Sequence, residues 1–142
     1  MPKILVVEDD TIWQRMIPLQ LSGLQGIINT VATGEEAISQ FDEAVRLNEP
    51  YDACVLDSMF PKKGGDLPDY SAPLEIAREF IIVRKKLSPH RVFVIGSIAD
   101  FVKEGMDSIG LKNFYFKDKG NRQPYQKHYI HLTADLSQSL RR

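Results

Sequence analysis

The chain has 142 residues, of which 43% are hydrophobic and 26% are charged, and its formal net charge is -1. A chain of this length fits one domain, predicted to span residues 1–142, which can bury a core without disulfides or a structural metal. The balanced charge excludes a general electrostatic affinity for nucleic acid, and no apolar run has the length of a membrane span or signal peptide. We therefore expect a cytoplasmic protein with no direct nucleic-acid or membrane partner.

Apolar runs and helical patterns alternate in the first half of the chain. Strands are predicted at 3–7, at 27–32 and up to Asp57. The first of these runs is apolar without alternation, as expected of a strand that helices cover on both faces. The helix predicted at 11–22 has Thr11 as N-cap and Ile12, Met16 and Leu19 as its inner face, and Pro18 should kink or break its last turn. A second helix opens at 33–36 and ends before residues 49–50.

The second half begins with a long loop and ends with a long helix. Residues 62–73 are rich in Pro and Gly and predict a functional or mobile loop, in which only Leu67 and Tyr70 could anchor. A helix is expected at 74–87, a strand at 92–95, a short helix ending near residue 109 and a fifth strand at 113–116. Apolar residues then recur from Tyr125 to Leu140 at spacings of three and four, which predicts a final helix at about 124–140 with Pro124 in its first turn.

This order of elements predicts an α/β fold. Five strands that alternate with five helices favour a parallel sheet with right-handed crossovers and helices on both faces. We expect a flavodoxin-like, doubly wound sheet with strand order 2-1-3-4-5. In such sheets the ligand site lies outside the carboxyl ends of the strands.

Charged side chains follow three of the predicted strands. Glu8 and Asp9 come after the first strand, Asp57 ends the third, and Lys117 follows the fifth. Carboxylates that meet at one sheet edge repel one another and normally hold a divalent cation, here Mg²⁺. With Lys117 to neutralise incoming phosphoryl oxygens, Asp57 can serve as the nucleophile of a phosphoryl transfer.

The motifs at these strand ends resemble those of the receiver domain of two-component response regulators. The resemblance covers about residues 2–140 and depends on five segments: 4–10, 33–37, 55–61, 96–97 and 116–117. It implies that Asp57 accepts a phosphoryl group from a phosphohistidine of a sensor kinase or phosphotransfer protein. It also implies that the chain is a signalling domain that assists its own phosphotransfer and autodephosphorylation, and not a turnover enzyme.

The same resemblance implies a role for each site residue. Mg²⁺ would be held by Glu8, Asp9, Asp57 and the backbone carbonyl of Met59. Ser97 would be the hydroxyl switch, Phe114 the aromatic rotamer switch and Lys117 the phosphoryl-contacting lysine. The output would be contact with a downstream protein or a homodimer, through the face of the fourth helix, the fifth strand and the final helix.

Three departures from the family pattern keep an alternative open. Asp118 follows Lys117 where the family has a cis-proline, Ile98 stands where a small residue is usual and could crowd the phosphoryl pocket, and the 62–73 loop is long. These departures favour a pseudo-receiver, an interaction module that works without phosphorylation. A haloacid-dehalogenase type of phosphohydrolase is disfavoured, because its second Asp would stand at position 59, which is Met.

Overall fold

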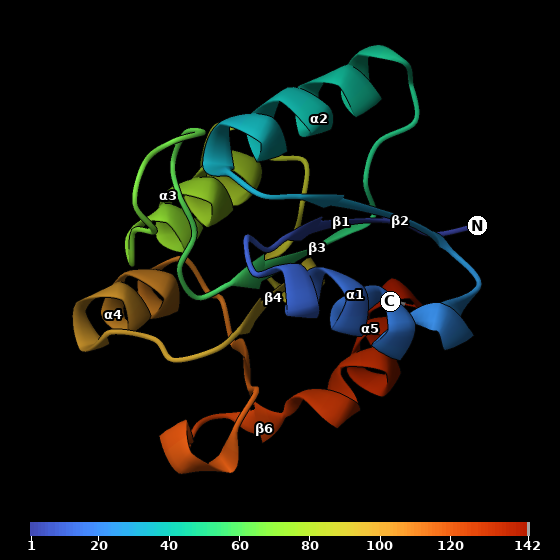
Figure 1. Cartoon of the computed structure of the whole chain (residues 1–142). Coiled ribbons are helices and arrows are strands. Elements are labelled where there is room, and N and C mark those ends of the chain that lie inside the picture. Colours follow the sequence, from blue (N-terminus) through green and yellow to red (C-terminus); the bar gives the residue numbers. More distant parts are fainter. Residues whose placement is uncertain (142) are drawn as a thin grey trace.

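The computed structural model describes residues 1–141, in which strands and helices alternate along the chain (Figure 1). The strands are β1 (Lys3–Val7), β2 (Ile27–Val31), β3 (Ala53–Asp57), β4 (Val92–Ile95), β5 (Asn113–Phe116) and β6 (Lys127–His128). The α-helices are α1 (Thr11–Gln20), α2 (Gly34–Arg46), α3 (Ala72–Arg78), α4 (Asp100–Ser108) and α5 (Leu132–Leu140). Short helical segments are η1 (Ser22–Leu24), η2 (Glu79–Val83), η3 (Pro89–Arg91), η4 (Lys119–Asn121) and η5 (Tyr129–His131).

The strands form one parallel sheet in the order β2-β1-β3-β4-β5-β6. The predicted fold class, the five main strands and their order are confirmed. A sixth strand was not predicted: Lys127 and His128 pair with Tyr115 and Phe116 along the outer edge of β5. None of the helices in residues 1–141 is long and apolar enough to cross a bilayer.

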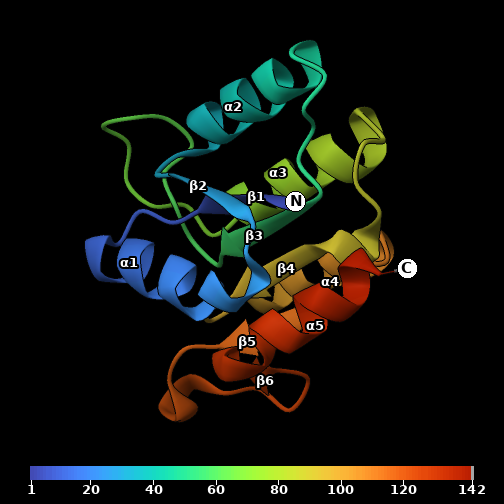
Figure 2. The ribbon, with the colours of Figure 1, turned by 90° about the vertical axis from the view of Figure 1, so that its right-hand side faces the viewer.

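Helices cover both faces of the sheet, which splits the core into two layers (Figures 1 and 2). On one face α2, α3 and α4 pack around Phe41 and Phe80, whose rings stack 3.9 Å apart. On the other face α1 and α5 contribute Ile17 and Leu132 to a second cluster. Successive strand residues point to opposite layers, as the pleat requires, so a strand with both faces covered is apolar throughout.

Helix α1 buries a different face from the predicted one. Ile12 and Leu19 are 67% and 71% exposed, whereas Ile17 and Leu21 are buried. Asp10, not Thr11, is the N-cap, because its carboxylate accepts from the backbone N–H groups of the first turn. Both apolar stripes have helical spacing, so the periodicity could not decide between them. The helix ends at Gln20, two residues after Pro18 and two residues before the predicted end, which agrees with a last turn broken by the proline.

The long loop is shorter than predicted, and the helix after it ends earlier. Helix α3 starts at Ala72 and continues into η2, a π-helical turn that ends at Val83 instead of residue 87. Leu67 does not anchor the loop, since it is 85% exposed, and Tyr70 is half exposed. The loop is instead held at its base by the buried Phe60, which forms an isolated bridge with Asp69.

The predicted final helix at about 124–140 is wrong in its first half. Helix α5 begins at Leu132, and residues 119–131 form η4, a turn, β6 and η5. The buried Gln126 holds this segment on the sheet: its side-chain amide donates to the carbonyl oxygens of Gly96 (2.7 Å) and Tyr115 (3.0 Å). These bonds and the pairing of β6 replace the hydrogen bonds that a helix at 124–131 would have made.

Candidate functional site

The parallel register brings the predicted acidic residues together at the carboxyl edge of the sheet. Val7 pairs with Leu56, so Glu8 follows β1 directly beside Asp57, the last residue of β3. Oxygen atoms of Glu8, Asp9 and Asp57 lie within 4.8 Å of one another. Glu8 is fully buried and Asp57 is 7% exposed. The cluster is thus a built feature of the sheet edge and not a set of solvated loop carboxylates.

Lys117 reaches this cluster from the end of β5. Its Nζ donates to Asp57 Oδ1 at 2.9 Å and to Glu8 Oε2 at 3.0 Å. The ammonium also lies 4.8 Å from the centre of the Trp13 ring, a cation–π distance. One lysine therefore faces several carboxylates, and the site retains excess negative charge.

The pKa values reflect this imbalance. Burial, and then the charge of Asp57, raises the pKa of Glu8 to about 7, although Lys117 opposes the shift. Burial also raises the pKa of Asp57 against the opposing charge of Lys117. Burial lowers the pKa of Lys117, but the charges of Asp57 and Glu8 outweigh it and the net shift is upward. Lys117 therefore stays protonated at neutral pH, but its single positive charge does not balance the carboxylates around it.

The donor set fits a hard divalent cation. All the candidate ligands are oxygens, and Mg²⁺ prefers one or two carboxylates together with water. A cation at Glu8, Asp9 and Asp57 would supply the positive charge that Lys117 alone does not. Met59 lines the same pocket as Asp57, and its role as a carbonyl ligand stays a prediction.

The predicted hydroxyl switch lies in the same pocket. Ser97 and Lys117 line a hollow of about 300 Å³ around Asp57, and Ser97 is exposed within it. Gly96 keeps the hollow open: its φ is +123°, and a Cβ atom there would lie 2.3 Å from Ser58 Oγ and 3.3 Å from Asp57 Oδ1. This position therefore requires glycine for both its backbone and its space.

The structure places two other predicted residues in the core. Ile98 is buried among core side chains and does not line the pocket, so the expected crowding of the phosphoryl pocket is wrong. Phe114 is 3% exposed, with its ring edge-on to Tyr125 at 5.4 Å. Phe114 is therefore packed in the core in this structure, and its role as a rotamer switch stays a prediction.

Gln126, in the segment after Lys117, contacts the loop of the site, and the sequence analysis did not predict this role. No peptide bond in residues 1–141 is cis, and Asp118 caps η4 by accepting from Gly120 N at 3.2 Å. Gln126 then bonds to the carbonyl of Gly96, next to Ser97. A single amide in an apparently helical pattern gives no signal of such a role, because its partners lie 11 and 30 residues away.

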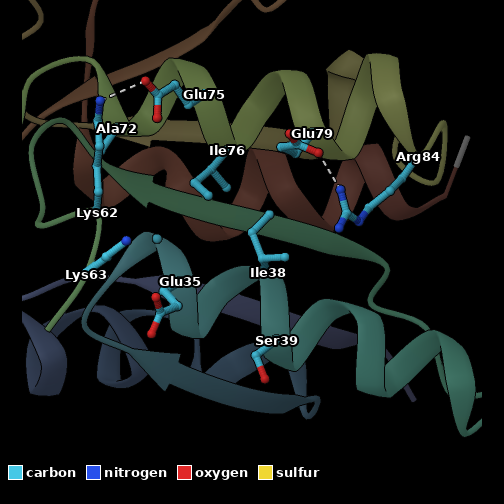
Figure 3. Close-up of a pocket in the computed structure, with 11 residues that line it drawn as sticks. Glu35, Ile38, Ser39, Lys62, Lys63, Ala72, Glu75, Ile76, Glu79 and Arg84 are labelled. Atoms are coloured by element: carbon cyan, nitrogen blue, oxygen red, sulfur yellow. Dashed lines mark hydrogen bonds and ion pairs between the residues drawn. The ribbon is translucent and has the colours of Figure 1, made fainter.

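A larger groove of about 610 Å³ lies elsewhere, between α2 and α3 (Figure 3). Its charges are balanced: three basic and three acidic residues line it, namely Lys62, Lys63, Arg84, Glu35, Glu75 and Glu79. Ion pairs close both ends, with Lys62 on Glu75 at 2.9 Å and Arg84 on Glu79. It lacks the excess charge that marks the cluster at Asp57.

Comparison with known proteins finds similarity at the level of structure only. Neither a protein-family model nor a curated protein sequence matches the chain. A response regulator receiver domain from Clostridium thermocellum is similar, with a TM-score of 0.68, 19% identity, and coverage of 99% of this chain and 95% of the other. The BeF3-activated DrrB receiver domain has a TM-score of 0.66 and 25% identity, with 100% and 99% covered. The BeF3-activated N-terminal receiver domain of Klebsiella pneumoniae RstA has a TM-score of 0.64 and 22% identity, with 99% of each chain covered.

Proposed function

We propose that this chain, which has the fold of response regulator receiver domains, is a phosphoacceptor signalling domain in which Asp57 receives a phosphoryl group. The observation that carries this proposal is the 2.9 Å hydrogen bond from Lys117 to Asp57, inside a pocket that also contains Ser97. A strand-end carboxylate, an opposed ammonium and a nearby hydroxyl are the parts that phosphoryl transfer to an aspartate needs.

The donor would be a phosphohistidine of a sensor kinase or phosphotransfer protein. A carboxylate oxygen of Asp57 attacks phosphorus, the N–P bond breaks, and the imidazole nitrogen keeps the electron pair and takes up a proton. Four residues would hold the Mg²⁺ that offsets the charge of the phosphoryl oxygens: Glu8, Asp9, Asp57 and, through its carbonyl, Met59. The Lys117 ammonium would contact the phosphoryl oxygens as they are transferred, and the Ser97 hydroxyl would donate a hydrogen bond to one of them.

The output would be a change in protein contacts and not turnover of an external substrate. Ser97, drawn to the phosphoryl group, moves the β4–α4 loop, and the domain then assists the hydrolysis of its own acyl phosphate. The sequence placed the output face on α4, β5 and α5. Because β6 pairs along the outer edge of β5, that face includes the segment from η4 to η5.

A phosphorylation-independent pseudo-receiver is the second candidate. The observation that favours it is the remodelled segment after Lys117, where Asp118 starts η4 and α5 begins only at Leu132. Such a module would bind its partner protein through the same surfaces, without a change in conformation on phosphorylation.

Intact-mass measurement separates the two candidates. After incubation with acetyl phosphate and Mg²⁺, the wild type should gain one phosphoryl group and Asp57→Asn none. Asp66→Asn, at an exposed loop position, serves as the control and should gain one group. If the wild type gains nothing while its fold is intact by circular dichroism, the pseudo-receiver is supported. A mass gain that survives Asp57→Asn would refute Asp57 as the acceptor.

A further inference from the structure

A second groove, of about 670 Å³, lies beside the sheet edge formed by β5 and β6. The segment from η4 to η5 builds it, and its lining includes Phe116, Lys119, Arg122, Lys127, His128 and Ile130. We call it the basic groove. In Figure 1 this segment, in orange, projects from the sheet beyond β6, away from α2 and α3.

The charge of the basic groove is one-sided. Three of its lining residues are Lys or Arg and none is Asp or Glu, in contrast to the balanced groove between α2 and α3. Lys127 pairs with Asp135 at 3.0 Å, but within residues 1–141 Lys119 and Arg122 have no carboxylate partner. Asp118 lines the pocket of Asp57 and not the basic groove, and its carboxylate accepts from Gly120 N at the start of η4. Two cations are thus available to an anionic ligand.

The groove also offers an apolar contact. Ile130 is 54% exposed, while Phe116, at 5%, forms a buried part of the wall with Arg122 5.9 Å from its ring centre. His128 lies edge-on to Phe116 at 5.1 Å. The Phe116 ring therefore has no open face on which a nucleic-acid base could stack.

We propose that the basic groove binds an acidic segment of a partner protein that also carries an apolar side chain, and that Gln126 makes this binding respond to the loop of Ser97. Charge complementarity selects the acidic ligand. The two available cations, with Lys127 already paired to Asp135, are few for nucleic acid, whose affinity comes largely from phosphate contacts that can number about 6–10 in one protein. An acidic peptide needs only a few such contacts, and its apolar side chain covers Ile130.

Gln126 supplies the connection between the groove and the phosphoacceptor pocket. It lines the groove, and its buried amide donates to Gly96 O at 2.7 Å, next to Ser97. Its side-chain oxygen accepts from Gln123 N at 2.9 Å, which ties the turn after η4 to the same amide. This part of the proposal rests on the proposed function: when Ser97 moves toward a phosphoryl group, Gly96 O moves with it and Gln126 carries the shift to the groove.

Binding to the groove is tested with a fluorescein-labelled peptide, Leu-Glu-Glu-Leu-Glu-Glu-Leu, by anisotropy and amide chemical shifts. In the unmodified protein, the shifts should concentrate in residues 116–131, and Lys119→Glu with Arg122→Glu should weaken binding roughly tenfold. Lys86→Glu, a charge reversal at an exposed site elsewhere, should leave the affinity unchanged. Equal affinity of the double variant and wild type, or shifts outside the groove, would refute the docking surface.

Two other occupants are outcomes of the same experiment. A short oligothymidine that binds more tightly than the peptide, and loses that affinity in the double variant, would overturn the proposal in favour of nucleic acid. A dimer in sedimentation that the double variant abolishes would assign the groove to a second copy of this chain. The peptide with Gln in place of every Glu should bind at least tenfold more weakly if charge complementarity is the cause.

The coupling is tested separately. Acetyl phosphate treatment should change the peptide affinity of the wild type at least threefold, and Gln126→Met, still phosphorylated by mass, should bind equally in both states. Should Gln126→Met not fold, amide shifts of residues 119–131 in phosphorylated wild type serve instead, and their absence refutes the coupling. If Asp57 takes up no phosphoryl group, the proposed function and the coupling fail together, whereas peptide binding by the unmodified protein still decides the docking surface.

Discussion

Lys117 Nζ lies 2.9 Å from Asp57 Oδ1 although 60 residues separate them in sequence. The same nitrogen contacts Glu8 Oε2 at 3.0 Å, so one ammonium serves two buried carboxylates. Because burial leaves these carboxylates short of positive charge, the site destabilises the fold when all of them are ionised. The first two predictions follow from this imbalance.

Glu8→Gln should stabilise the metal-free domain at high pH. The pKa of Glu8 is about 7 in the folded state against an ordinary 4.5, so the folded state binds more protons than the unfolded state between these values. Stability is therefore lost as pH rises from about 4.5 to above 7, and at pH 8 the variant should gain about 2 to 3 kcal/mol of unfolding free energy.

Urea unfolding at pH 5 and pH 8, without Mg²⁺, measures this difference. At pH 5 the gain in unfolding free energy should be much smaller, because Glu8 in the folded state is then already mostly protonated. Glu104→Gln, at an exposed position in α4, is the control and should show no comparable pH dependence. An equal effect of Glu8→Gln at both pH values would mean that Glu8 keeps an ordinary pKa.

Mg²⁺ should bind without a phosphoryl group, and Asp9→Asn should weaken binding more than Glu8→Gln. The reason is that Glu8 already shares Lys117 and accepts from Asp10 N at 3.1 Å, which leaves Asp9 the freer ligand. Trp13 fluorescence should report the titration, since the Lys117 ammonium lies 4.8 Å from that ring. Calorimetry provides a check that does not depend on the ring, and unchanged affinity in Asp9→Asn would remove Asp9 from the ligand set.

Gly96→Ala should damage both stability and phosphorylation. The φ of +123° strains any residue with a Cβ atom, and that atom would come within 2.3 Å of Ser58 Oγ. We expect a loss of about 2 to 4 kcal/mol in unfolding free energy, together with a loss of mass gain from acetyl phosphate. The control is Gly64→Ala, where a Cβ atom meets nothing within 4 Å. Normal phosphorylation of a stable Gly96→Ala protein would contradict the close packing around Asp57.

Removal of residues 64–67 should leave the fold nearly as stable as before. Leu67 is 85% exposed, and the deletion spares both the bridge between Phe60 and Asp69 and the ion pair of Lys62 with Glu75. The change in unfolding free energy should stay within about 1 kcal/mol, whereas Phe60→Ala should lose about 3 to 5 kcal/mol. Thermal and urea unfolding of the two variants provide the comparison, and a similar loss in both would show that the loop tip supports the core.

Elements with a local signal could be predicted from the amino-acid sequence. Continuous apolar runs in a chain of alternating helices predict strands buried on both faces, and these runs end directly before the charged residues of the site. Parallel strands then bring Glu8, Asp57 and Lys117 to one edge, so the central cluster followed from the fold class alone. Thr33 at the start of α2 is a similar case, since its side chain accepts from Glu36 N as an N-cap does.

Features that depend on partners far away in the sequence could not be predicted, because those partners meet only in the folded chain. In α1 two apolar stripes have equal helical spacing, and contact with the sheet selects Ile17 and Leu21 over Ile12 and Leu19. Between residues 124 and 131 the spacing of apolar residues favours a helix, yet the chain pairs with β5 for two residues and then turns. The decisive bonds there join Gln126 to carbonyls of β5 and of the loop after β4. Periodicity records which side chains are apolar, whereas the hydrogen bonds of a buried amide depend on backbone groups that meet it only after the chain has folded.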